Sequence, residues 1–236
     1  MIDTTYRTDD PEIMDDFAME GENLIDALDK IASINRLLGG NKITLDGVKS
    51  LIENVPLSQE IKIIDLGCGN GDMLRMLADF AQQENRNFKL IGVDANNNTI
   101  LRAKELSTVY PNISYLTENV FSPKFENFQY DISLCTLTLH HFKEEELLQI
   151  MQILKRNSSI GIVINDLQRS ALAYRLFQLL GFVFRLKKMP KEDGLTSILR
   201  GFKKQELIDY SKKLQLTNYK IQWKWAFRYQ WIISKI

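Results

Sequence analysis

Three glycines at alternate positions, Gly67, Gly69 and Gly71, have the spacing that most clearly indicates a ligand site in this sequence. They follow a short β-branched run, Ile61 to Leu66, and a stretch of helical character begins at about Asp72. Glycines in such a turn let the backbone bend sharply and leave room for a ligand to lie against it. The order of strand, glycine loop and helix predicts a nucleotide-type site.

Two aspartates near this loop narrow the choice of ligand. Asp94 ends the second apolar run, where an acidic side chain can accept hydrogen bonds from both hydroxyls of a ribose. Its alternative role is to cap the helix that follows. Asp65 precedes the loop, where it would repel a pyrophosphate and attract the ammonium of an amino acid. The glycine spacing also differs from the G-x-G-x-x-G dinucleotide fingerprint, and no phosphate-binding lysine follows it.

Strands and helices alternate around this loop. Because parallel neighbours need crossover connections, the alternation predicts an α/β fold: a Rossmann-like, doubly wound sheet, mostly parallel, with helices on both faces. A late pair of β-rich runs predicts a C-terminal antiparallel hairpin. The predicted strands cover residues 61–66, 88–94, 113–116, 130–135, 159–164, 219–227 and 229–233, and the predicted helices residues 72–84, 98–110, 143–156, 171–186 and 205–214.

The two ends of the chain depart from this alternation. Apolar residues at helical spacing predict a helix that stops at Gly39-Gly40 and a second helix over residues 44–55. We therefore predict a helical N-terminal cap over the cofactor site in residues 1–58. Residues 59–236 would form the main domain, with a helical insertion at about 167–215 on the substrate side. The apolar stretch 171–186 fits either core or dimer packing or a lid over an apolar substrate, and Trp223, Trp225, Phe227 and Trp231 are expected in the hairpin and core.

The composition limits the class of protein. Lys+Arg and Asp+Glu balance at 30 each, so no net field favours nucleic acid. The first part of the chain is acidic and the part beyond Arg169 is basic, which predicts either a solvated acidic arm or an arm folded back over the basic half. The two cysteines, Cys68 and Cys135, predict neither a disulfide nor a metal site. With no signal-like start and no apolar run of membrane length, we expect a cytoplasmic protein.

From about Ile61 to Asp166 the sequence resembles the class I S-adenosylmethionine-dependent methyltransferases. Residues 64–71, Ile-Asp-Leu-Gly-Cys-Gly-Asn-Gly, are similar to the family's first motif, and Gly92-Val93-Asp94 to its second. The resemblance implies S-adenosylmethionine as cofactor, with S-adenosylhomocysteine as product. It also implies that Asn119 accepts a hydrogen bond from the adenine amino group. The implied cofactor-binding residues are Asp65, Gly67, Cys68, Gly69, Gly71, Asp94, Ala95, Asn119, Val120, Cys135 and Thr136.

Methyl transfer from a sulfonium needs alignment and exclusion of water more than a particular catalytic residue. The two histidines, His140 and His141, follow the fourth strand, where one can deprotonate a hydroxyl or where both shape the pocket. Asp166 ends the fifth strand, where it either orients an acceptor or caps a helix. These three residues are the catalytic candidates.

We therefore predict methyl transfer to a small molecule, at the oxygen of an aromatic or lipophilic metabolite, by a protein that can be a homodimer. A non-catalytic cofactor-binding or scaffold protein of the same fold is the first alternative. A nicotinamide-dependent oxidoreductase is the second, and the glycine spacing disfavours it.

Overall fold

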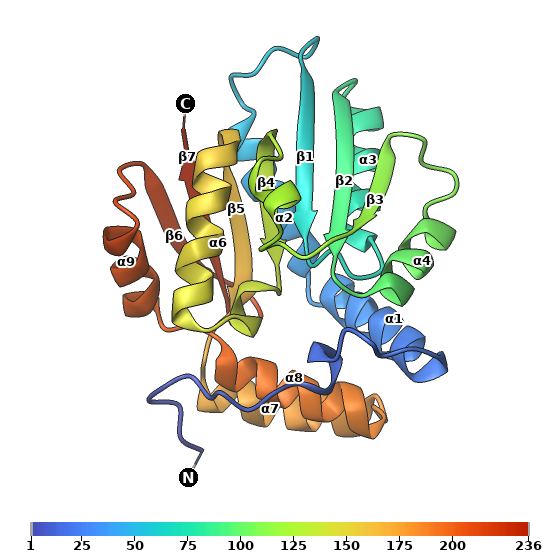
Figure 1. Ribbon diagram of the computed structural model, residues 1–236. Coiled ribbons are helices and arrows are strands. Elements are labelled where there is room, and N and C mark those ends of the chain that lie inside the picture. The colour runs from blue at the N-terminus through green and yellow to red at the C-terminus, as the bar shows by residue number, and fades with distance from the viewer. Residues whose placement is uncertain (1, 236) are drawn as a thin grey trace.

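A computed structural model describes residues 2–235 of the chain, so the predicted domain limits at residues 1 and 236 lie outside the described part. A seven-stranded sheet in the order β3-β2-β1-β4-β5-β7-β6 forms its centre (Figure 1). Only β7 runs against the others, since it pairs antiparallel with both β5 and β6. The strands are β1 (Glu60–Leu66), β2 (Asn87–Asp94), β3 (Ile113–Thr117), β4 (Tyr130–Thr136), β5 (Ser158–Leu167), β6 (Tyr219–Lys224) and β7 (Arg228–Ser234).

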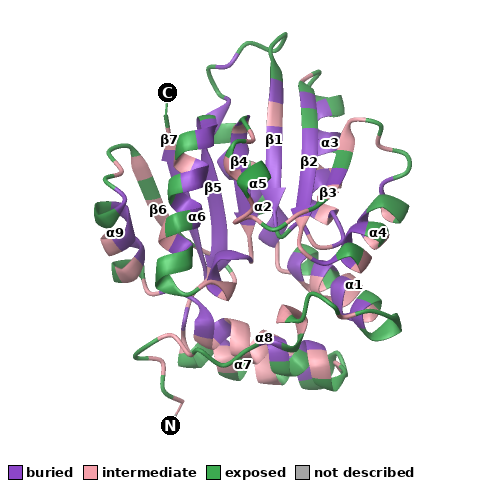
Figure 2. Cartoon of the chain, in the orientation of Figure 1, coloured by how far each residue is buried: buried purple, intermediate pink, exposed green. Residues whose placement is uncertain are grey.

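Helices cover both faces of this sheet. One face packs against α2 (Gly40–Leu51), α3 (Asp72–Gln83) and α4 (Asn97–Leu106), and the other against α5 (Pro123–Glu126), α6 (Glu144–Asn157) and α9 (Lys204–Lys213). The central strands are buried almost throughout (Figure 2), which explains their nearly continuous apolar sequences. In α6, Leu147, Ile150, Met151 and Leu154 recur at helical spacing and are buried, so one stripe of the helix seals the sheet.

A third group of elements lies across the carboxyl ends of the strands (Figure 1). It contains α1 (Glu22–Leu37), α7 (Ala171–Val183) and α8 (Lys188–Arg200), together with two short 3-10 helices, η1 (Ile13–Asp15) and η2 (Leu139–His141). These elements enclose the end of the sheet where ligands bind in open α/β folds. No helix in residues 2–235 has the length and apolar character needed to span a bilayer.

The predicted fold class is confirmed, and the differences have physical reasons. The second helix begins at Gly40 rather than at residue 44 and ends at Leu51. Gly39 alone makes the turn, with φ of 73°, whereas Gly40 is already helical and, by lacking a side chain, leaves room for Asn35. Helix α8 was not predicted, since Pro190 and Gly194 interrupt its pattern. Pro190 lies in the first helical turn, where no backbone donor is required.

The late aromatic residues Trp223, Trp225, Phe227 and Trp231 all lie in the hairpin of β6 and β7, as expected, but they differ in burial. Trp231 is fully buried in the core, as expected. Trp223 and Trp225 are 51% and 68% exposed, because β6 is the edge strand of the sheet and Trp225 lies in the turn between β6 and β7. Of the segment expected on the substrate side, α7 and α8 lie across the strand ends, whereas Leu207, Tyr210 and Leu214 pack α9 onto the sheet.

Candidate active site

A single cavity of about 740 Å³ lies between the strand ends and the third group of elements. The glycine loop and the ends of β2 and β4 line one half, which we call the loop half. Helices α7 and α8, η1 and the turn before β7 line the other half, which we call the helix half. The two halves are continuous, so a ligand on the loop can meet a ligand under α7.

The glycine loop keeps its backbone open toward the cavity. Gly67, Gly69 and Gly71 have φ of 62°, 52° and 78°, in the left-handed region that favours glycine. A Cβ atom on Gly71 would lie 2.1 Å from the hydroxyl of Tyr115, so this glycine permits close packing. A Cβ on Gly69 would meet only Leu28, at 3.9 Å, and would otherwise occupy the space of the cavity. Gly69 is therefore the position where a ligand can lie directly on the backbone.

Two buried carboxylates face this loop. Asp94 accepts hydrogen bonds from the backbone N–H groups of Gly69, at 3.3 Å, and Asn96, at 3.0 Å. Burial raises the pKa of Asp94, and these backbone donors partly offset that effect. Asp65 is 2% exposed, and its Oδ1 has no hydrogen-bond partner. Burial, with the nearby charges of Asp72 and Asp94, raises the pKa of Asp65 well above its usual value. A cationic ligand group beside Asp65 would stabilise the charged form of this carboxylate.

Nine of the eleven predicted cofactor-binding residues line the cavity, and the other two do not. Gly71 begins α3 behind the loop, and Cys135 is buried in the core between β1 and β5. Asn119 is exposed, and its side-chain oxygen already accepts a hydrogen bond from the N–H of Phe121, at 2.9 Å. A second lone pair of that oxygen remains for a ligand. The nine lining residues are Asp65, Gly67, Cys68, Gly69, Asp94, Ala95, Asn119, Val120 and Thr136.

The N-terminal segment is fastened to both halves of the site. In the loop half, Asn70 donates to Asp29 of α1 at 3.0 Å, and Asn96 donates to the carbonyl of Met19 at 2.9 Å. In the helix half, the carboxylate of Asp193 accepts from the backbone N–H groups of Ile13, at 2.7 Å, and Met14, at 3.1 Å. The acidic arm therefore does fold back over the C-terminal half, as the second of the two predictions had it.

The three catalytic candidates lie together where η1 crosses η2. His140 Nδ1 and Asp166 Oδ1 are 2.6 Å apart, and both side chains are 2% exposed. Burial opposes the ionisation of Asp166, but its interaction and hydrogen bond with His140 outweigh burial and hold the pKa of Asp166 below its usual value. Asp166 does not line the cavity, so it would not touch a ligand there itself.

His141 occupies a different environment from His140. Its side chain is 30% exposed and lines the cavity, and its Nδ1 lies 2.7 Å from Asp15 Oδ1. The guanidinium of Arg200 donates to the other oxygen of Asp15, at 2.6 Å. Although burial opposes ionisation, these two hydrogen bonds hold the pKa of Asp15 far below its usual range. The rings of His140 and His141 stack, with centroids 4.3 Å apart.

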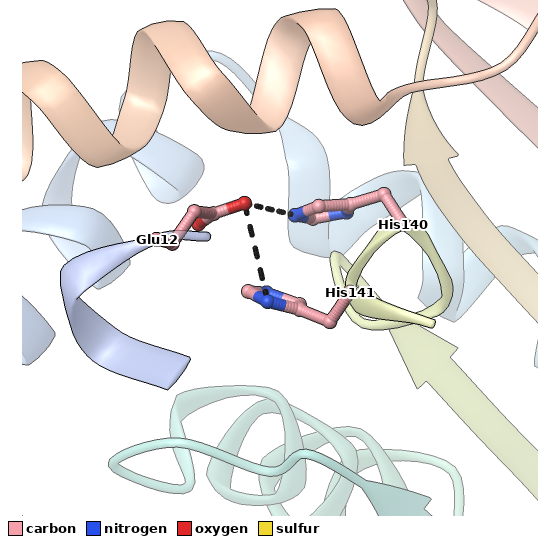
Figure 3. A group of neighbouring side chains, drawn as sticks. All are labelled: Glu12, His140 and His141. Carbon is pink, nitrogen blue, oxygen red and sulfur yellow. Dashed lines mark ion pairs between the residues drawn. The ribbon is translucent and has the colours of Figure 1, made fainter. Parts of the chain in front are cut away.

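Glu12 points at both imidazoles (Figure 3). Its Oε1 lies 3.6 Å from His140 Nε2 and 3.9 Å from His141 Nδ1. The three groups have the spacing of a metal site, which the sequence did not predict. However, the permanent positive charge of Arg200 lies 3.6 Å from the same oxygen of Glu12, and it would repel a metal cation. The arrangement therefore suits the holding and moving of protons better than metal ligation.

Sequence reasoning missed several residues of the helix half. Glu12 and Asp15 were noticed only as part of an acidic arm, and the charge asymmetry was the signal for their contact with α8. Arg200 and Asp193 lie on a helix that was not predicted. Leu137, in the left-handed region with φ of 56°, turns the chain from β4 toward the histidines without any glycine to mark the turn.

Helix α7 separates the cavity from solvent. Ala173, Leu176, Phe177 and Leu180 line the cavity, whereas Leu172, Leu179 and Phe182 are 58%, 59% and 78% exposed. The helix is therefore apolar on both sides. Its inner side gives the helix half an apolar wall, which is compatible with the lid alternative, and its exposed outer side leaves the alternative of dimer packing open.

Comparisons with known proteins agree with this geometry. Residues 63–159 match the model of a family described as a methyltransferase domain. No curated protein matches the sequence. The solved structure of the plantazolicin methyltransferase BpumL in complex with S-adenosylhomocysteine is 17% identical, with a TM-score of 0.64, over 91% of this chain and 90% of that chain.

Two further structures share the fold. Magnesium protoporphyrin IX methyltransferase from Synechocystis PCC 6803, with bound S-adenosylhomocysteine, is 13% identical, with a TM-score of 0.57, over 92% of this chain and 90% of that chain. A methyltransferase dependent on S-adenosylmethionine, from Aquifex aeolicus, is 16% identical, with a TM-score of 0.60, over 89% and 98%. Residues 63–159 thus match a methyltransferase domain, and the chain has the fold of S-adenosylmethionine-dependent methyltransferases of known structure.

Proposed function

We propose that this protein transfers the methyl group of S-adenosylmethionine to an oxygen atom of a small aromatic or lipophilic molecule. The continuity of the loop half with an apolar helix half, in one cavity of about 740 Å³, is the observation that carries the proposal. This volume lies in the range of pockets that enclose small ligands. Two of the structures named above are methyltransferases named for small molecules, plantazolicin and magnesium protoporphyrin IX, which supports the same class of acceptor.

The residues of the loop half fit the cofactor. The unpartnered Oδ1 of Asp65 would accept a hydrogen bond from the methionine ammonium, and Asp94 would accept from the ribose hydroxyls. Gly69 leaves space for the ligand against its backbone. S-adenosylmethionine supplies a methyl group that is already activated, so the chain has to hold donor and acceptor in line and keep water away.

The helix half supplies the acceptor side. Phe177 and Leu180 of α7 and Ile198 of α8 offer an apolar surface. The other end of this half contains His140 and His141 and is covered by η1. When the acceptor is a hydroxyl, His141 takes its proton. With Nδ1–H donated to Asp15, the Nε2 atom of His141 is the acceptor. His140, held by Asp166 and buried beneath Glu12, positions His141 by stacking on it.

Two measurements test this function. Calorimetry should show binding of S-adenosylhomocysteine and none of NADH. Tritium from labelled S-adenosylmethionine should appear in low-mass molecules that partition into organic solvent from a cell extract. Label that enters only protein or nucleic acid would overturn the class of acceptor. Cofactor binding without any transfer would favour the non-catalytic alternative.

A substitution separates the role of His141 from simple packing. His141→Gln should lower kcat by about 100-fold or more and leave the Kd of S-adenosylhomocysteine within about twofold. Exposed Lys143→Gln, next to η2, is the matched control. An unchanged kcat in His141→Gln would exclude this residue as the proton acceptor. The cytoplasmic location and the homodimer remain predictions.

A further inference from the structure

Arg228 is a buried cation that lacks a counterpart. It begins β7, is 3% exposed and lines the cavity in the helix half. Its Nε and Nη1 have no hydrogen-bond partner. No carboxylate of residues 2–235 lies within 4.0 Å of it. The other two buried arginines in residues 2–235 each have an acidic partner, Glu206 for Arg169 and Asp15 for Arg200, both at 2.6 Å.

An unpaired guanidinium inside a protein is costly, because burial removes its hydration and nothing replaces it. Burial lowers the pKa of Arg228 to about 10, and the more distant charge of Asp166 opposes that effect. The side chain therefore remains charged at neutral pH. Gly40 lies against it, since a Cβ there would come within 3.1 Å of Arg228 Cζ. The absence of a side chain at Gly40 therefore leaves room for the guanidinium, and no acidic side chain of residues 2–235 forms an ion pair with it.

Polar groups lie near Arg228, since Asn35 adjoins Gly40 beside the guanidinium and the charge of Asp166 acts on it, but the cavity that Arg228 lines also has an extensive apolar wall. Trp225, Ala226 and Phe227 precede Arg228 in the turn before β7 and line the cavity. Ile34 of α1 and Leu38, which follows α1, line the same cavity. A guanidinium in a cavity with an apolar wall matches a molecule that has an apolar body and one acidic group. Its planar donors can hold both oxygens of a carboxylate.

We propose that Arg228 binds a carboxylate of the methyl acceptor, so that the acceptor is an aromatic or aliphatic acid. The methylated oxygen is then a hydroxyl of that molecule or the carboxylate itself. This inference rests on the proposed function for the existence of an acceptor, but its binding site can be tested without methyl transfer.

The order of the strands favours the acceptor over the cofactor as the source of the carboxylate. Arg228 on β7 is three strands away from Asp65 on β1, with β4 and β5 between them. Neighbouring strands lie about 4.8 Å apart, so the two strands are roughly 14 Å apart. The ammonium and carboxylate of methionine share one carbon atom. A cofactor whose ammonium lies on Asp65 would therefore hold its carboxylate closer to β1 than to β7.

The experiment compares a charged probe with a neutral probe of the same shape. Protein saturated with S-adenosylhomocysteine is titrated with 4-hexylbenzoate and with 4-hexylbenzamide. The wild type should bind the benzoate about 10- to 100-fold more tightly. Arg228→Gln should abolish this preference, and Arg228→Lys should keep part of it. Arg175→Gln, an exposed arginine on the outer side of α7, is the matched control and should retain the full preference.

Three outcomes would overturn the proposal. The first is equal binding of the two probes by the wild type, which does not depend on whether any variant folds. The second is an undiminished preference in Arg228→Gln. In the third, Arg228→Gln weakens S-adenosylhomocysteine but not 5′-methylthioadenosine, which lacks the amino acid, and the carboxylate is then that of the cofactor. Failure of the wild type to bind S-adenosylhomocysteine would instead refute the proposed function.

The thermal stability of the ligand-free protein gives an independent readout. If Arg228 served only to hold the fold together, Arg228→Gln would lower the Tm. If Arg228 is instead an unpaired buried charge that serves to bind a ligand, Arg228→Gln should have a Tm equal to or above that of the wild type. The benzoate should then raise the Tm of the wild type and not that of the variant.

Discussion

The loop half and the helix half of the cavity are built in opposite ways. The loop half uses one continuous stretch, β1, the glycine loop and α3, together with the end of β2. Its contacts to a ligand come largely from backbone and two aspartates. The helix half joins side chains that are far apart in the sequence, such as Glu12, His140, Asp193 and Arg228. The loop half therefore depends on local sequence, whereas the helix half depends on how distant segments pack together.

Removing the charge of Asp65 is the strongest way to break the loop half. Asp65→Asn should weaken S-adenosylhomocysteine about 100-fold, because the ammonium loses a charged partner, a change of about 3 kcal/mol. Binding of 5′-methylthioadenosine, which has no ammonium, should change little and serves as the control. Equal losses for both ligands would show that the substitution damages the loop rather than the ammonium contact.

The same substitution should stabilise the ligand-free protein. The pKa of Asp65 is raised in the folded state. Its contribution to stability is therefore present at low pH and is lost as the pH rises above the ordinary value of 3.8. Asp65→Asn should then have the higher free energy of unfolding at pH 7, and its advantage should shrink toward pH 3. Denaturant unfolding at the two pH values measures this.

Filling the space at Gly69 tests the loop half through shape instead of charge. Gly69→Ala should weaken S-adenosylhomocysteine roughly 30-fold, about 2 kcal/mol, because the new methyl group intrudes on the ligand. Gly39→Ala is the matched control, since Gly39 has φ of 73° and nothing within 4 Å of a Cβ atom. Both variants carry the strain of a left-handed alanine. Only the first should lose cofactor affinity.

Releasing the N-terminal arm should affect the helix half alone. Asp193→Ala removes the acceptor of the Ile13 and Met14 N–H groups. We expect kcat/KM to fall about tenfold, because the polar end of the cavity opens to water, with S-adenosylhomocysteine binding unchanged. Asp209→Ala, exposed on α9, is the control. A parallel loss of cofactor affinity would show that the two halves are not separable.

The smallest expected effect concerns the pH dependence of stability. The pKa of Asp15 is depressed in the folded state, so its contribution is present above its ordinary value of 3.8 and is lost as the pH falls below that value. Asp15→Asn should lower the free energy of unfolding by about 1 to 2 kcal/mol at pH 7. The difference from the wild type should decline below pH 4. A constant difference from pH 7 to pH 2 would contradict the assignment.

The two halves also differ in how far the sequence predicts them. The glycine loop, Asp65 and Asp94 are recognisable because local spacing determines their geometry. His140 and His141 were found because residues after a parallel strand reach the binding edge. The same argument included Cys135, which does not line the cavity, because it lies inside β4 before the strand ends and packs in the core on the α6 face of the sheet. Arg228 had no local signal, because its role depends on a cavity formed by distant segments.

The contact between η1 and α8 also affects the order in which parts of the protein can fold during synthesis. The residues joined at Ile13 and Asp193 are separated by 180 positions. During synthesis the arm leaves the ribosome early, whereas α8 follows only after the central strands. The sheet and its glycine loop can therefore assemble while residues 7–15 still lack their partners. Among the parts of the cavity, the cover over the histidines is the one that must wait for the chain to be nearly complete.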